Sequence, residues 1–361
     1  MATPSNTLAM AAGIAVAAAG GALFAWIHTP LPWMLGAIFA TACAQVAGAH
    51  LAPLPAGRPL AFVVVGTSLG LYFTAPVVAQ VGHQWPWFVA LGFAALGFGS
   101  LSAWVLARVS GADRATAYFG SMPGGAAEMA LMGERFGASV HSVALAHSLR
   151  MICVVTVFPV AITLAGFHAT EDYRPIVLPY DPAALALLLA ITGAGGCVAR
   201  VLHVPTAFMM GALVTSIGLT MSGVQLSSVP TPLTNAAQVL LGAALGSRFE
   251  REFLRDAPRF LLGMVPALAV MLACAALVGW ALSAGSGAYL GAGILAAAPG
   301  GIAEMSITAK VLRINVAFVT AAHVVRYAIV VLLTIPLYRF FAGRAMADNG
   351  SVPPPAERNP P

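Results

Sequence analysis

Six ionisable residues stand in a repeated pattern within an otherwise apolar sequence. Residues 123–129 have the sequence PGGAAEM, and residues 299–305 have PGGIAEM. In each copy a histidine follows the glutamate by nineteen positions, and an arginine follows that histidine by three. Carboxylates and imidazoles can take up and release protons, and a guanidinium can balance a carboxylate. The candidate solute- or ion-binding residues are Glu128, His147, Arg150, Glu304, His323 and Arg326.

The element that must position each glutamate is a broken helix. Proline removes a backbone donor and glycine permits unwinding, so a Pro-Gly-Gly sequence interrupts a helix. Each glutamate lies three residues past the second glycine, in the first turn of the helix that restarts. A helix N-terminus carries free N–H groups and a partial positive charge, so the break predicts a small polar site. The helix-break residues are Pro123, Gly124, Gly125, Pro299, Gly300 and Gly301.

The composition predicts a chain embedded in a lipid bilayer. Of the 361 residues, 60% are hydrophobic and 8% are charged, whereas soluble domains carry about 25% charged residues. The net charge of +5 comes from scattered arginines, with Lys310 the only lysine. No basic cluster could follow a phosphate backbone, so we expect no nucleic-acid partner. The segment MATPSNT at the start has no positive residue, so the first apolar stretch is expected to be a retained span.

The sequence is duplicated, with a first membrane repeat at 8–165 and a second at 182–342. A polar linker, 166–181, separates the repeats, and a polar, proline-rich tail at 345–361 is expected to be disordered. Each repeat also carries a Gly-x-x-x-Gly spacing, typical of close helix packing. The matching residues are Gly66, Leu69, Gly70 and Phe73 in the first repeat and Gly242, Leu245, Gly246 and Phe249 in the second.

Each repeat offers five apolar spans in addition to its Pro-Gly-Gly segment. A membrane-crossing helix needs about 20 residues. The expected spans are 8–27, 33–51, 59–80, 86–107 and 138–165, then 182–202, 207–227, 233–248, 260–283 and 314–342. The fold class is therefore an all-α polytopic membrane protein.

Loop charge favours an inverted arrangement of the repeats. If the Pro-Gly-Gly segments dip into the membrane and return, one face collects eleven Arg or Lys residues and the other three. If they cross fully, the split is eight to six. Positive residues favour the cytoplasmic side, so we predict inverted repeats with both termini in the cytoplasm. Twelve crossings remain the alternative.

The charged residues allow two interpretations. Two Glu and two Arg sum to zero, so they could form internal ion pairs that lock the repeats together. Alternatively, they line a site near the midplane, as in transporters with broken helices. Each histidine could relay protons or could orient its Glu or Arg.

Enzyme chemistry has little support in the sequence. We find no phosphate-binding loop, nucleophile elbow or paired-histidine metal motif, so we predict no cofactor and no metal and favour a non-enzyme. A metal site would have to draw Glu128, Glu304, His147 and His323 from both halves. The cysteines Cys43, Cys153, Cys197 and Cys274 have no metal-type spacing and are expected to be packed thiols.

The duplicated unit resembles a known family. The opening pattern H-x-P-x-x-x-M-x-G-A, the P-G-G-x-A-E-M block and the H-x-x-R helix are similar to the AbrB-type bacterial inner-membrane proteins. This resemblance implies a multi-pass protein of the bacterial inner membrane. It also carries two functional labels, regulation of gene expression and an ammonia monooxygenase activity.

The residues favour a secondary transporter of a small solute. A membrane protein that regulates gene expression indirectly is the second hypothesis, with the loop between Arg248 and Arg259 as its contact surface. A metal-dependent oxidase is the third. A homo-oligomer is compatible with each of the three.

Overall fold

The computed structural model describes residues 4–167, 179–249 and 258–348, and regular structure in these ranges is entirely helical. The segments 168–178, 250–257 and 349–361 lie outside the described residues, so most of the linker and of the Arg248–Arg259 loop is not placed. The all-α expectation is confirmed. The helices of the first half are α1 (Pro4–Trp26), α2 (Pro32–Val46), α3 (Gly57–Gly70), α4 (Ala75–Gly82), α5 (Trp85–Ser110), α6 (Arg114–Ser121), α7 (Ala126–Glu134) and α8 (Val140–Leu164). Those of the second half are α9 (Pro182–Val201), α10 (Ala207–Met221), α11 (Thr231–Gly246), α13 (Pro258–Ser286), α14 (Leu290–Ala297), α15 (Ile302–Val311) and α16 (Val316–Asp348).

Six helices in the described part of the chain are long and apolar enough to cross a membrane, namely α1, α5, α8, α9, α13 and α16. The protein is therefore a multi-pass membrane protein. The sequence predicted ten spans, but α2 and α10 have only 15 residues each and α11 has 16. Helix α16 continues to Asp348, so the first residues of the expected tail are helical.

The expected span 59–80 is wrong as a single helix. Helix α3 ends at Gly70, and α4 begins at Ala75 with its axis turned by 89°. Pro76 lies in the first turn of α4, where its missing N–H leaves no hydrogen bond unmade. In the interior of a continuous helix the same proline would remove a backbone bond, so the chain bends ahead of it.

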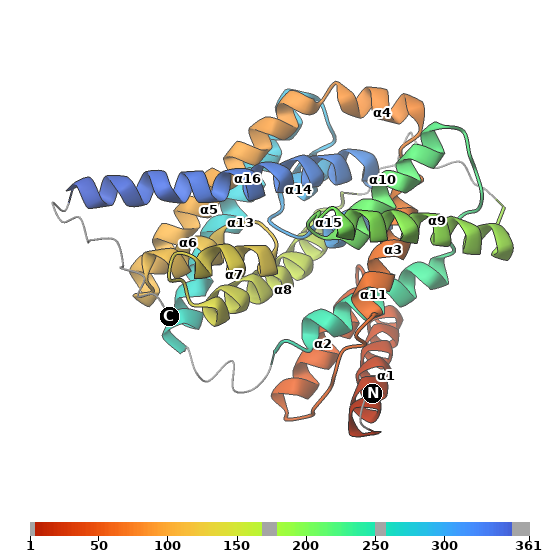
Figure 1. Ribbon diagram of the computed structural model, residues 1–361, viewed down its shortest axis with the longest axis horizontal. Coiled ribbons are helices and arrows are strands. Elements are labelled where there is room, and N and C mark those ends of the chain that lie inside the picture. The colour runs from red at the N-terminus through yellow and green to blue at the C-terminus, as the bar shows by residue number, and fades with distance from the viewer. Residues whose placement is uncertain (1–3, 168–178, 250–257, 349–361) are drawn as a thin grey trace, which may run out of the picture.

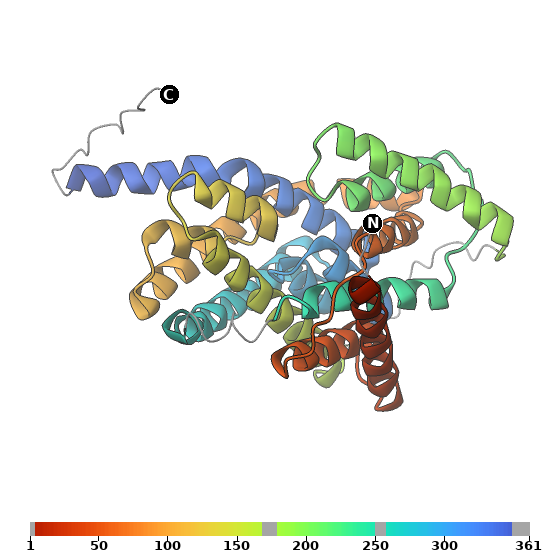
Figure 2. The same cartoon turned by 60° about the horizontal axis from the view of Figure 1, so that its bottom comes forward.

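Two lobes, each built from both halves of the sequence, make up the molecule (Figures 1 and 2). The six-helix lobe contains α1, α2 and α3 from the first half together with α9, α10 and α11 from the second. The hairpin lobe contains α5 to α8 together with α13 to α16. The two halves are therefore interleaved in space, and helix α4 reaches α16 of the hairpin lobe.

Reciprocal glycine contacts hold the six-helix lobe together. A Cβ on Gly66 of α3 would lie 2.7 Å from Met209 O of α10, and one on Gly242 of α11 would lie 2.8 Å from Met34 O of α2. Lipid tails are as apolar as leucine, so membrane helices associate through close packing of small residues. These contacts confirm the close-packing interpretation of the Gly-x-x-x-Gly spacing, and their reciprocity is compatible with a duplicated unit.

Each Pro-Gly-Gly segment forms a helical hairpin whose two ends lie side by side. In the first hairpin, α6–α7, Ser139 N donates to Thr116 Oγ1 at 2.8 Å, joining the residues after α7 to the first turn of α6. In the second, α14–α15, a Cβ on Gly291 would lie 3.3 Å from Ile314. A segment that crossed the membrane would separate these ends by the bilayer thickness, about 30 Å. The geometry therefore favours segments that dip and return.

Candidate functional site

The arginine of each His-x-x-Arg pattern holds the broken backbone of its own hairpin. Arg150 donates from Nη1 to Met122 O at 2.6 Å and from Nη2 to Gly124 O at 3.0 Å. Arg326 donates from Nη1 to Ala298 O and from Nη2 to Gly300 O at 2.9 Å. In both halves these carbonyls belong to the residue before the proline and to the first glycine. Because the last carbonyls of a helix have no partner within it, each guanidinium closes the end of α6 or α14.

The two glutamates lie at helix N-termini, whereas the two arginines bind carbonyls at helix C-termini. Glu128 and Glu304 lie in the first turns of α7 and α15, where a carboxylate is stabilised by the free N–H groups and the helix dipole. A Cβ on Gly125 would overlap Glu128 Oε2, and a Cβ on Gly301 would overlap Glu304 Oε2. The second glycine of the motif therefore leaves room for the carboxylate three residues later.

The first glycine of the motif makes room for the methionine. A Cβ on Gly124 would lie 2.6 Å from Met129 Cε, and a Cβ on Gly300 would lie 2.8 Å from Met305 Cγ. Both methionines are completely buried. The spacing of P-G-G-x-A-E-M therefore follows from one turn of the chain, in which the Met side chain packs on the first glycine and the Glu side chain packs on the second.

The structure does not support the interpretation of internal Glu–Arg ion pairs. The hydrogen bonds of Arg150 and Arg326 go to backbone carbonyls and, for Arg150, to His147 Nδ1 at 3.0 Å. A guanidinium can only donate, so His147 Nδ1 accepts and its ring proton lies on Nε2, which donates to Phe119 O at 3.0 Å. Both ring nitrogens are engaged in a completely buried site, which favours the orienting role for His147 over a proton relay.

A cavity of about 110 Å³ lies between the two lobes and is lined by both helix breaks. Helices α3, α10 and α11 of the six-helix lobe form one wall, and the two hairpins with α8 and α16 form the other. The space suffices for a small cluster of waters or a solute of a few non-hydrogen atoms. The repeated-motif residues that line it are Pro123, Gly124, Gly125, His147, Arg150, Gly300, Gly301, Glu304 and Arg326.

Three of the predicted residues lie elsewhere. Glu128 lines an adjoining cavity of about 690 Å³, which shares Arg58 and Arg248 with the first. Pro299 and His323 line neither cavity, and His323 is completely buried with Nδ1 bonded to Val319 O at 3.0 Å. The structure therefore brings the two breaks together but does not place the two glutamates in one cavity.

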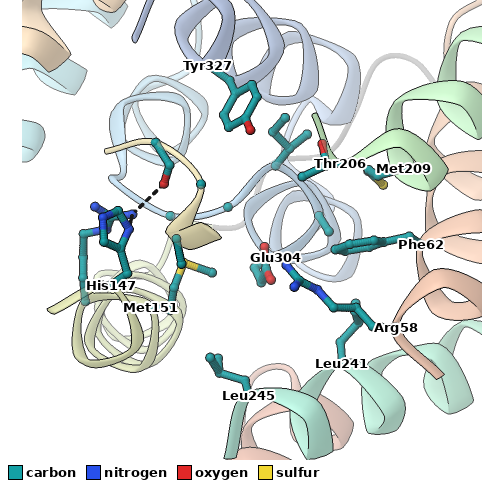
Figure 3. Close-up of a pocket in the computed structure, with 18 of the residues that line it drawn as sticks. Arg58, Phe62, His147, Met151, Thr206, Met209, Leu241, Leu245, Glu304 and Tyr327 are labelled. Atoms are coloured by element: carbon teal, nitrogen blue, oxygen red, sulfur yellow. Dashed lines mark hydrogen bonds between the residues drawn. The ribbon is translucent and has the colours of Figure 1, made fainter. Parts of the chain in front are cut away.

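Two arginines outside the repeated motifs complete the site. Arg58, near the start of α3, packs over the Phe62 ring at 5.0 Å and points toward Glu304 (Figure 3). Arg248 follows the end of α11. Burial lowers the pKa of the Arg248 guanidinium, repulsion by Arg58 adds to this effect, and attraction by Glu304 opposes it. Arg58, Arg248 and Glu304 therefore share one electrostatic environment.

Two hydroxyl groups lie in the cavity wall. Thr206 Oγ1 is buried and makes no hydrogen bond in the structure, and Tyr327 Oη is buried beside the Glu128 carboxylate. The Tyr327 hydroxyl points into the cavity (Figure 3), and it lies 3.1 Å from where a Gly125 Cβ would stand. Thr206 has a φ of 48°, a left-handed conformation that is rare for a β-branched residue and is often found at functional sites.

Sequence reasoning missed Arg58, Arg248, Thr206 and Tyr327 as site residues because none of them is repeated. Matching by the glycine and arginine motifs places Tyr72 opposite Arg248 and Met151 opposite Tyr327. A search for duplicated patterns discards such positions. A comparison of matched positions could have found Arg248, because this charged residue stands where the first repeat has the uncharged Tyr72.

Metal ligands do not gather in the described residues. No group of three or more His, Cys, Asp or Glu side chains there is placed to hold a metal ion. His147 and His323 make their bonds within their own halves, to Phe119 O, Arg150 and Val319 O.

The chain is similar to several known proteins. A family model described as "Transition state regulatory protein AbrB" matches residues 33–342. A Bacillus subtilis (strain 168) protein named "Uncharacterized protein YhjN" is 27% identical over 359 residues, which cover 90% of this chain and 91% of that protein. An Escherichia coli (strain K12) protein named "Putative regulator AbrB" is 25% identical over 324 residues, which cover 88% and 92%.

Proposed function

We propose that this chain, which belongs to the AbrB family, is a secondary transporter of a small solute in the bacterial inner membrane. The observation that carries the proposal is the position of the cavity, which lies between two lobes and is lined by both broken hairpins. Transporters with broken helices bind their solute at such a point, and rocking of one lobe against the other exposes it to each side in turn.

A contact that crosses between the lobes near the cavity is of a kind that suits such a movement. Lys310 Nζ of α15 donates to Ser68 Oγ of α3, a contact between two side chains that can be exchanged. The hairpins are instead tied within their own lobe, as by Tyr118 Oη, which donates to Thr334 O at 3.0 Å. The hairpin lobe can therefore move as a unit.

Glu304 is the group best placed to couple a proton to transport. Its carboxylate faces the cavity beside Arg58 (Figure 3) and is half-buried. Glu128 occupies the equivalent place in the adjoining cavity. A carboxylate at such a site can change its proton occupancy as the environment of the cavity changes.

Uptake of a metabolite mixture into proteoliposomes tests the proposal against many solutes at once. Purified protein is reconstituted, a pH gradient is imposed, and the lumen is analysed by mass spectrometry against protein-free liposomes. We expect at least one solute to accumulate, and we expect Glu304→Gln and Glu128→Gln to remove the dependence on the pH gradient. Glu134→Gln, which changes an exposed glutamate at the end of α7, is the matched control.

Two results would contradict the proposal. Wild-type vesicles that take up nothing beyond the protein-free level would exclude transport. Full pH-dependent uptake by correctly inserted Glu128→Gln and Glu304→Gln variants would exclude the glutamates as the coupling groups.

Regulation of gene expression is the second candidate, supported by the names of the family model and of the Escherichia coli relative. The proposed contact surface is the Arg248–Arg259 loop, of which 250–257 lie outside the described residues. Neutralising Arg251 and Arg255 should abolish a regulatory phenotype and leave uptake unchanged. An unchanged phenotype would remove this version of the hypothesis.

A further inference from the structure

We propose that the cavity between the lobes binds a small organic anion, a carboxylate with a short apolar body, between Arg58 and Arg248. This inference rests on the proposed function in that it names the class of the solute. It is carried by the balance of charge around the cavity, by the unpartnered Thr206 hydroxyl in its wall and by the apolar side chains that complete it.

The charges of the repeated motif are already matched by helix ends. Arg150 and Arg326 close carbonyl ends, where the helix dipole is negative, and Glu128 and Glu304 lie at amide ends, where it is positive. Neither arginine is available to a ligand without releasing the backbone of its hairpin. The repeated motif therefore stabilises the broken ends of the two hairpins, but its charges are not free to bind a charged ligand.

Arg58 and Arg248 are not matched by a helix end, although Glu304 attracts Arg248. Neither side chain makes a hydrogen bond or an ion pair with another residue in the described parts of the chain, and both line the two adjoining cavities. With both glutamates ionised, the four arginines leave the combined lining with a net charge of +2. An anion between Arg58 and Arg248 lowers the cost of holding this charge away from bulk water.

The neutral part of the lining fits the rest of such a solute. Thr206 Oγ1 is a buried donor without an acceptor, and a carboxylate supplies one. The remaining wall is apolar and made by Phe62, Met151, Met209, Leu241 and Leu245 (Figure 3). An inorganic oxyanion would leave these side chains facing an empty or wet space, so a carboxylate with an aliphatic body is the better match.

Ligand-induced stabilisation of the purified wild-type protein tests the inference directly. The probes are the sodium salts of acetate, butyrate and hexanoate, each compared with sodium chloride at equal ionic strength. Butyramide and butylammonium chloride match butyrate in size but are neutral and cationic, and sodium sulfate is the inorganic control. A ligand that binds only the folded state raises the melting temperature as its occupancy rises. We expect at least one carboxylate to raise it, with butyramide, butylammonium and sulfate without effect.

Variants locate the binding site. Arg58→Gln and Arg248→Gln should each weaken the apparent affinity for the best carboxylate roughly ten- to a hundred-fold, as for loss of a charge-assisted hydrogen bond. Arg108→Gln is the matched control, because Arg108 also packs over an aromatic ring, that of Trp104 at 5.0 Å, but lines neither cavity. Equal affinity in wild type, Arg58→Gln and Arg248→Gln would overturn the inference.

The outcomes separate this inference from the proposed function. Stabilisation by no carboxylate, by sulfate alone, or equally by butyramide would overturn the carboxylate class, whatever solute the vesicles accumulate. Carboxylate binding that depends on Arg58 and Arg248, without uptake into vesicles, would support the site and contradict transport.

Discussion

Arg150 Nη2 donates a hydrogen bond to the carbonyl oxygen of Gly124 at 3.0 Å, and Arg326 bonds the equivalent Gly300 at 2.9 Å. The motif P-G-G-x-A-E-M and the motif H-x-x-R are therefore parts of one structural unit. The Pro-Gly-Gly sequence frees backbone carbonyls, and an arginine from the following long helix satisfies them. This unit accounts for two buried arginines without assigning either to a carboxylate.

Replacing Arg150 or Arg326 should therefore destabilise the hairpins. In Arg150→Gln, the carbonyls of Met122 and Gly124 lose their charged donors, and we expect the free energy of unfolding to fall by about 3 kcal/mol. The free energy of unfolding of Arg150→Lys should lie between those of wild type and Arg150→Gln, because a single ammonium group cannot donate two hydrogen bonds in the forked geometry of a guanidinium. Unfolding in detergent measures both, with Arg108→Gln expected within about 0.5 kcal/mol of wild type. Equal stability of Arg150→Gln and wild type would show that the carbonyls find other partners.

The second glycine of each motif should be coupled energetically to its glutamate. Gly301→Ala places a Cβ against Glu304 Oε2, and we expect a loss of about 1 kcal/mol in unfolding free energy together with altered pH dependence of uptake. In a Glu304→Ala background the same change should cost close to nothing, because the obstructing carboxylate is gone.

Gly97→Ala is the control for this cycle, since Gly97 is exposed on α5 and a Cβ there meets no atom within 4 Å. Additive effects of Gly301→Ala and Glu304→Ala would contradict the coupling. The cycle depends on stability alone and so is independent of what the protein transports.

Sequence reasoning predicted the parts of this molecule that are repeated. The all-helical class, the helix breaks and the close-packed glycines follow from local rules on proline, glycine and apolar length. The composition of the lobes was not predictable, because local sequence patterns do not indicate which distant helices pack together, such as α3 on α10 and α2 on α11. The partners of the charged residues were not predictable for a related reason. The sequence shows that the formal charges of the Glu and Arg residues sum to zero, which suggests ion pairs. The helix ends that compensate these charges instead form only when the backbone folds.

The glycines of the six-helix lobe should be sensitive to small additions. Gly66→Ala places a Cβ 2.7 Å from Met209 O, and Gly242→Ala places one 2.8 Å from Met34 O. Backbone atoms cannot move aside without separating the helices, so we expect each change to cost about 1–3 kcal/mol of unfolding free energy. Gly218→Ala on α10, where a Cβ meets nothing within 4 Å, should be neutral. Three variants of equal stability would show that these helix contacts do not determine the packing.

Labelling of single cysteines tests the hairpins and the inversion of the repeats separately. The native cysteines are first replaced, and Arg114→Cys and Glu134→Cys are introduced at opposite ends of the first hairpin, where both positions are exposed. Because Ser139 bonds to Thr116, both should react with a membrane-impermeant maleimide from the same side. Reaction from opposite sides would show that the segment crosses the membrane.

The second hairpin gives the matching measurement. Ala284→Cys, in the last turn of α13 just before α14, and Val311→Cys, at the end of α15, are at exposed positions and should also share one side. If the repeats are inverted, this side is the one opposite to Arg114 and Glu134, as the eleven-to-three split of loop charges predicts. In intact cells the first pair should then be protected and the second pair labelled. Protection or labelling of all four positions together would establish parallel repeats and remove the argument for two cytoplasmic termini.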